Sequence, residues 1–237
     1  NTDFALDFVG TDEYINIRYH SDLEPENITI SAWVKSDVTG NYPAVVAKPW
    51  STSGFPSPYV SYYLSTSHAG VGKPYADINV AGTLYTVIAD NAITLDTWNH
   101  LAVTYDGTTV RLYVNGVVQA DTESVGGGSG VVSYAGTGNN SVVIGQRSHD
   151  GTSGDFFNGN IADVRIYNAA LDGTTEIPVL ASKINGDKAL GAGTTNLKGH
   201  WKLNESTIDD LDAGSVLDNS GNSHHGQAYG WDNDAAV

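Results

Sequence analysis

The feature that most constrains the fold is a pair of neighbouring segments whose apolar side chains recur at every second position. Apolar residues alternate along residues 101–105 and again along residues 110–114, with Asp106-Gly107 between the segments and Asn115-Gly116 after them. A spacing of two buries one face of a β-strand and leaves the other face wet. Asp-Gly and Asn-Gly are typical of tight hairpin turns. The pattern therefore predicts a β-hairpin that belongs to an antiparallel sheet.

The same alternation recurs through most of the chain, with turn residues between the segments. The predicted strands cover residues 14–18, 28–35, 44–48, 59–65, 76–80, 83–89, 141–146 and 161–167, in addition to the hairpin. Many short strands separated by turns are typical of a β-sandwich. We predict an all-β fold of two antiparallel sheets.

The length and composition favour one domain over residues 1–237. The chain has 237 residues, of which 40% are hydrophobic, and all-β sandwiches of this size are commonly single domains. We divide it into a main sandwich (1–170), a connector (171–198) and returning strands (199–237). A hydroxyl followed by an acidic residue near Thr174 or Thr175 favours a short helix in the connector.

The returning segment contains Trp201 and Leu203, which an isolated hairpin could not bury. Two interpretations are open: the start of a second repeat, or strands that complete the first domain. We favour completion, with the Trp201 strand paired beside the strand that starts near Tyr14, because this placement would cover both sheet edges.

Four segments in order resemble the laminin-G-like, concanavalin A-like domains, in particular their bacterial extracellular, pentraxin-like members. They are residues 5–15 (ALDFVGTDEYI), 28–35 (ITISAWVK), 98–116 (WNHLAVTYDGTTVRLYVNG) and 157–168 (FNGNIADVRIYN). The resemblance spans nearly the whole chain and implies a concanavalin A-like β-sandwich, or jelly roll. The fold implies little about function, because it carries lectins, adhesin modules, hydrolases and lyases alike.

The charge limits the partners of the chain. Eleven basic against 27 acidic residues give a net charge of −16, which argues against nucleic acid and against anionic membrane surfaces. No apolar run has the length of a membrane span, so we expect no membrane insertion. Without cysteine there is no disulfide, thiolate zinc site or cysteine nucleophile. We expect an extracellular, secreted or cell-surface module, part of a larger secreted protein.

The resemblance also implies a structural calcium ion that ties the opening strand to the last long strand. The matching residues are Gly10, Asp12, Glu13 and Asp163, although Val9 stands where the family often has Asp. Calcium binds six to eight hard oxygen ligands, which a turn with carboxylates can supply. The alternative is that Asp12 and Asp163 pair with Arg18 or Arg165.

The candidate ligand-binding residues are Trp50, Tyr75, Arg147, His149 and Asp150. Aromatic rings pack on the apolar face of a sugar, and planar polar groups can bridge two of its hydroxyls. The alternatives are that the tyrosines belong to the core and that Asp150-Gly151 only makes a turn.

Three functions remain open. The first is a noncatalytic carbohydrate-binding or adhesive module that calcium stabilises and that binds a glycan or polysaccharide. The second is a polysaccharide-degrading hydrolase or lyase, although none of the six glutamates has the Glu-x-Asp-x-Glu spacing of the related hydrolases. The third is a structural spacer of a large adhesin, without a ligand. We favour the first and predict no catalytic residues.

Overall fold

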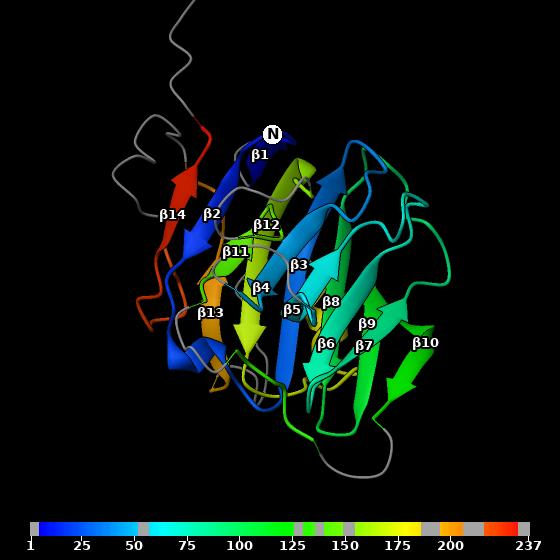
Figure 1. Cartoon of the computed structure of the whole chain (residues 1–237). Helices are drawn as coiled ribbons and strands as arrows, with labels where there is room; N and C mark the ends of the chain where they lie inside the picture. Colours follow the sequence, from blue (N-terminus) through cyan, green and yellow to red (C-terminus); the bar gives the residue numbers. More distant parts are fainter. Residues whose placement is uncertain are drawn as a thin grey trace, which may run out of the picture.

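The computed structural model describes residues 5–51, 57–125, 130–135, 140–148, 155–185, 195–205 and 216–231. In this part of the chain, two antiparallel sheets of seven strands each lie in two layers (Figure 1). The predicted all-β sandwich is confirmed. No helix among the described residues combines the length and the apolar character needed to cross a membrane.

The first sheet contains the signature hairpin. Its strands, in spatial order, are β1 (Leu6–Val9), β12 (Asn158–Tyr167), β3 (Ile28–Ser36), β8 (Asn99–Tyr105), β9 (Thr109–Val114) and β10 (Val117–Ser124), and β13 (Leu197–Trp201) also pairs with β12.

The second sheet faces the first across the core. Its order is β14 (Gly226–Tyr229), β2 (Tyr14–Ile17), β11 (Val142–Ile144), β4 (Ala44–Pro49), β5 (Val60–Ser65), β6 (Tyr75–Val80) and β7 (Thr83–Ile88). A short 3-10 helix, η1 (Ser21–Leu23), connects β2 to β3. Alternate residues of both sheets, among them Ile30, Val46, Leu101 and Ile144, are fully buried between the layers.

The turn residues of the hairpin act as their chemistry predicts. The Asp106 carboxylate accepts hydrogen bonds from the backbone amides of Thr108 (2.9 Å) and Thr109 (2.8 Å), which closes the turn between β8 and β9. Asn115 and Gly116 both have a positive φ, at 52° and 80°, as a type I′ turn requires.

The edge of β12 is shared by two strands from opposite ends of the chain. β1 pairs with the first part of this ten-residue strand, from Asn158 to Ile161, and β13 pairs with its last part, from Val164 to Tyr167. Asp163 lies between the two pairings, at a bulge where its φ is +53°.

The predicted pairing of the Trp201 strand beside Tyr14 is wrong. Trp201 pairs with Val164 of β12 in the first sheet, and the residue opposite Tyr14 is Tyr229 of β14. The reason is that β1 covers only part of the β12 edge and leaves the rest open for β13, whereas the open edge of β2 takes β14.

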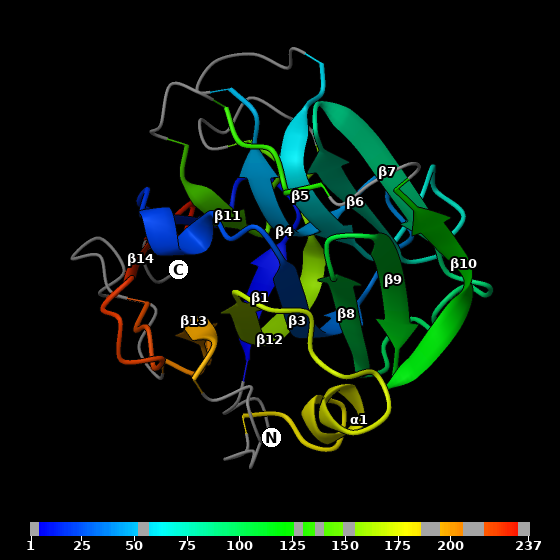
Figure 2. The ribbon, with the colours of Figure 1, turned by 90° about the horizontal axis from the view of Figure 1, so that it is seen from below.

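Part of the outer face of the first sheet is covered by a helix of the connector. The helix α1 (Glu176–Leu180) lies against this face, and Ile177 and Leu180 pack on Tyr113 and Tyr167 (Figure 2). The indole Nε1 of Trp33 also donates to the carbonyl of Leu180, at 3.3 Å. This part of the face is therefore occupied by the chain itself.

Trp201→Ala should lower the free energy of unfolding by about 3–5 kcal/mol, because the side chain is fully buried and its removal leaves a cavity. Urea unfolding measures the change. Leu217→Ala is the control, since Leu217 lies in the same returning segment but is 50% exposed. A loss below about 1 kcal/mol in Trp201→Ala would show that the returning strands unfold separately from the sandwich.

Candidate functional site

A group of aromatic and charged side chains gathers at one end of the outer face of the second sheet. We call it the outer-face cluster; its members are Tyr42, Tyr63, His68, Tyr75, Asp77, Arg147 and Asp155. They come together because β4 and β6 begin at this end of the sheet and β5 and β11 finish there. The connections β3–β4, β5–β6 and β11–β12 therefore meet above it.

The aromatic rings of the cluster contact one another, edge to face except for the tilted pair of Tyr63 and Tyr75. The ring of Tyr75 lies 5.8 Å from Tyr42, 5.5 Å from Tyr63 and 5.1 Å from His68, between ring centroids. Tyr63 and Tyr75 are buried, whereas Tyr42 and His68 are partly exposed. The buried pair forms a floor, and the partly exposed pair forms an accessible aromatic surface above it.

Arg147 joins this aromatic group to a carboxylate. Its Nη2 lies 2.5 Å from Oδ2 of Asp155, and its guanidinium carbon lies 5.9 Å from the ring centroids of both Tyr42 and Tyr63. The ion pair and the cation–π contacts hold the guanidinium plane in a fixed position.

Asp77 is a partly exposed acid of the cluster whose pKa is shifted well above its usual value. Burial raises the pKa of its carboxyl to about 6, against the opposing effects of the Thr86 hydroxyl, His68 and Arg147. The Thr86 hydroxyl donates to Oδ1 of Asp77 at 2.5 Å. A carboxyl that titrates near neutral pH beside a tyrosine and an arginine is typical of a functional site.

The structure brings together two of the predicted ligand-binding residues, Tyr75 and Arg147. Trp50 follows the last residue of β4, at the opposite end of the sheet, about 20 Å from the start of that strand. It is partly exposed, and its amide donates to the carbonyl of Tyr59. His149 and Asp150 lie outside the described residues.

Tyr42, His68 and Asp77 were not predicted. Tyr42 and His68 lie in connections without a local pattern, and Asp77 occupies an ordinary outward position of β6. The one signal in the sequence is the parity of β6, which places Tyr75 and Asp77 on the same face.

The four predicted calcium ligands are not brought together. Gly10, Asp12 and Glu13 lie in the turn after β1, and the last residue of β1 pairs with Asn158. Asp163 is five residues further along β12, which corresponds to about 16 Å. Among the described residues, the three carboxylates form no group of metal-ligand distance. The residues present therefore do not fit one shared ion. Calcium binding at the Gly10–Glu13 turn alone stays a prediction.

Asp163 instead pairs with the cation that the alternative interpretation named. Its carboxylate lies 2.7 Å from Nε of Arg165 and 2.8 Å from Nε2 of His200, and it accepts a bond from the amide of Asn185. Burial opposes the charge of Arg165, but Asp163 and Tyr167 outweigh it and hold the pKa of Arg165 above its usual value. Burial lowers the pKa of His200. This buried network ties β12 to β13.

A match to a family model shows which superfamily the chain belongs to. The family model described as the concanavalin A-like lectin/glucanases superfamily matches residues 9–175. The chain belongs to this superfamily. Among curated proteins, it is similar to pappalysin-1 of Mus musculus, with 29% identity over 131 residues. That match covers 52% of the chain but only 8% of the length of pappalysin-1.

Several solved structures share the fold at low sequence identity. A candidate carbohydrate-binding protein from Bacteroides ovatus ATCC 8483 has a TM-score of 0.68 at 19% identity; the match covers 95% of the chain and 58% of that protein. The SAP-like pentraxin of Limulus polyphemus has a TM-score of 0.57 at 18% identity and 78% and 85% coverage. The CBM40 of the Ruminococcus gnavus IT-sialidase, bound to α2,3-sialyllactose, has 0.56 at 18% identity and 74% and 96% coverage.

Asp163→Asn should lower the free energy of unfolding by about 3 kcal/mol, because it leaves Arg165 buried without its countercharge. The loss should be the same in calcium and in chelator, measured by thermal and urea unfolding. Asp12→Asn is the control and should change stability by less than about 0.5 kcal/mol in chelator, since Asp12 is exposed. A stability loss in Asp163→Asn that appears only in calcium would instead make Asp163 a calcium ligand.

Proposed function

We propose that the protein is a noncatalytic carbohydrate-binding module and that the outer-face cluster is its glycan site. The supporting observation is the combination of the partly exposed Tyr42 and His68 rings with the fixed guanidinium of Arg147. An aromatic plane packs on the C–H face of a sugar ring, and planar polar groups bond to its hydroxyls. The carbohydrate-binding neighbours of the same fold support this assignment.

The charges of the cluster favour a neutral glycan over an acidic one. Asp155 neutralises Arg147, and Asp77 adds a second carboxylate that is mostly ionised above pH 6. The chain as a whole carries a net charge of −16. An acidic sugar would therefore meet repulsion both locally and at long range.

A glycan-cleaving enzyme is the second candidate, because the raised pKa of Asp77 is a property that a general acid needs. A retaining hydrolase also needs a second carboxylate as nucleophile. The other carboxylate of the cluster, Asp155, is held in the ion pair with Arg147. Binding without turnover is therefore the better supported function, and incubation with the bound glycan should release no products.

We also propose that the module acts outside the cell and that the Gly10–Glu13 turn is where calcium would bind. The fold shared with a pentraxin and with a sialidase-associated binding module supports the location. For calcium, the turn offers the exposed carboxylate of Asp12 and its own backbone carbonyls, which are hard oxygen ligands. Calcium should raise the melting temperature, and magnesium at matched ionic strength should not.

Tyr42→Ala should weaken glycan binding about tenfold, because it removes one stacking surface worth about 1–2 kcal/mol. A glycan array selects the ligand, and calorimetry gives the affinity. Tyr59→Ala is the matched control, since Tyr59 is 48% exposed at the opposite end of the sheet. If Tyr59→Ala loses affinity and Tyr42→Ala does not, the site lies elsewhere.

The affinity for a neutral glycan should rise as the pH increases through about 6. In this range Asp77 loses its proton, and the carboxylate accepts stronger hydrogen bonds from sugar hydroxyls. Calorimetry between pH 5 and pH 8 tests this, and Asp77→Asn should flatten the profile. The same step in wild type and in Asp77→Asn would assign the titration to another group.

A further inference from the structure

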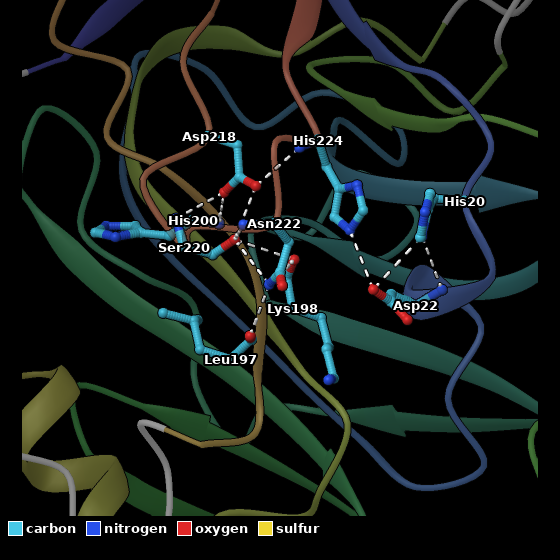
Figure 3. A network of polar contacts seen from close by, with 9 residues as sticks. All are labelled: His20, Asp22, Leu197, Lys198, His200, Asp218, Ser220, Asn222 and His224. Carbon is cyan, nitrogen blue, oxygen red and sulfur yellow. Dashed lines mark hydrogen bonds and ion pairs between the residues drawn. The ribbon is translucent and has the colours of Figure 1, made fainter.

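We propose that His20, Asp22 and His224 form a site for a divalent transition-metal ion of the zinc class. The three residues come from distant parts of the chain: His20 and Asp22 flank the start of η1, and His224 lies in the turn before β14 (Figure 3). One ligand atom from each lies within 4.8 Å of the others. This site is separate from the outer-face cluster and from the Gly10–Glu13 turn.

Two of the three distances between the ligand atoms already fit a single ion. Nδ1 of His20 and Nε2 of His224 both lie 3.6 Å from Oδ2 of Asp22. Zinc binds nitrogen and oxygen at about 2.0–2.2 Å, so the ligands of a tetrahedral site lie about 3.3–3.6 Å apart. The two imidazole rings are adjacent, with 4.1 Å between their centroids. A small shift of exposed side chains would complete the geometry.

The buried Nε2 of His224 also indicates that a ligand binds at this position. His224 is 7% exposed, and its Nε2 has no hydrogen-bond partner among the described residues. The nearest printed contact, Oδ2 of Asp22 at 3.6 Å, is too long for a hydrogen bond, and a metal ion at this position would supply the missing partner of the buried nitrogen.

The turn that carries His224 is fixed by a hydrogen-bond network around Asp218. This carboxylate accepts bonds from the amides of His200 (2.9 Å), Ser220 (2.8 Å) and His224 (2.9 Å) (Figure 3). Trp201 also donates to the carbonyl of His224 at 2.8 Å. The backbone of His224 is therefore held in place before any ion binds, which reduces the ordering cost of binding.

The ligand set selects the type of metal. Two imidazole nitrogens and one carboxylate suit zinc, nickel, copper or cobalt, whereas calcium and magnesium prefer oxygen alone. Three protein ligands leave one position open. This position can reach solvent, because the side chains of His20 and Asp22 are 49% and 41% exposed. Binding at Nδ1 of His20 would replace the 3.2 Å bond from the amide of Asp22.

The ion would join the first and last parts of the sandwich. η1 follows β2, His224 precedes β14, and β2 pairs with β14 at the edge of the second sheet. A metal at this point would bridge the two segments beyond the end of their pairing, and it should therefore raise the stability of this edge.

Metal-free protein, prepared with chelator and dialysed, is titrated with Zn²⁺ by calorimetry, and with Co²⁺ by visible absorption. We expect one equivalent of Zn²⁺ in wild type. His20→Gln and Asp22→Asn should weaken binding by more than the 10–100-fold that loss of an outer-shell partner costs. His225→Gln is the control, since this neighbouring histidine is exposed and its Nδ1 accepts a hydrogen bond from the amide of Asp218.

The variants of the exposed side chains, His20→Gln and Asp22→Asn, test the proposal even if His224→Gln does not fold. Wild-type affinity in His20→Gln and Asp22→Asn would overturn the proposal, and so would equal losses in His225→Gln. Absence of Zn²⁺ binding to wild type at micromolar concentration would overturn it as well. Titration with Ca²⁺ or Mg²⁺ in place of Zn²⁺ should give the same heat in wild type and in His20→Gln.

Discussion

The structure depends on the edge of β12, which two strands from opposite ends of the chain divide between them. β1 covers the first part and β13 the last part, and neither could cover the whole strand. Asp163 lies at the junction, where a bulge turns its carboxylate toward Arg165 and His200. If β1 or β13 were missing, part of the β12 edge would be left unpaired. If Asp163 or Arg165 were missing, the other would be left as a buried charge without its partner. The closing strands are therefore part of the sandwich itself.

This closure also determines which face is free for a ligand. The helix α1, which lies between β12 and β13 in the chain, packs on Tyr113 and Tyr167 at the outer face of the first sheet. The second sheet has no such helix among the described residues. Its outer face carries the aromatic and charged cluster where three connections meet, and the β12 network and the cluster lie in different sheets. The buried network that stabilises β12 and the proposed glycan site thus lie on separate surfaces, so that substitutions can test each alone.

Much of the fold could be predicted from the sequence, because the alternation along β8 and β9 and the turn residues Asp106 and Asn115 act locally. The partner of Trp201 could not, since pairing depends on which edge remains open after the other strands are placed. In the site, Tyr75 and Arg147 were found by residue type. Tyr42 and His68 were missed because their connections have no periodic pattern. His20 and His224 lie near opposite ends of the sequence, and the pairing of β2 with β14 brings them together.

We propose that a glycan binds on the outer face of the second sheet, at Tyr42, His68, Asp77 and Arg147. Backbone-amide NMR spectra of the folded protein, recorded with increasing amounts of the glycan selected by an array, test it most directly. The largest shifts should occur in the start of β6, the end of β5 and the β3–β4 connection, with β8 and β9 unchanged. Shifts confined to the first sheet or to the segment around Trp50 would contradict it.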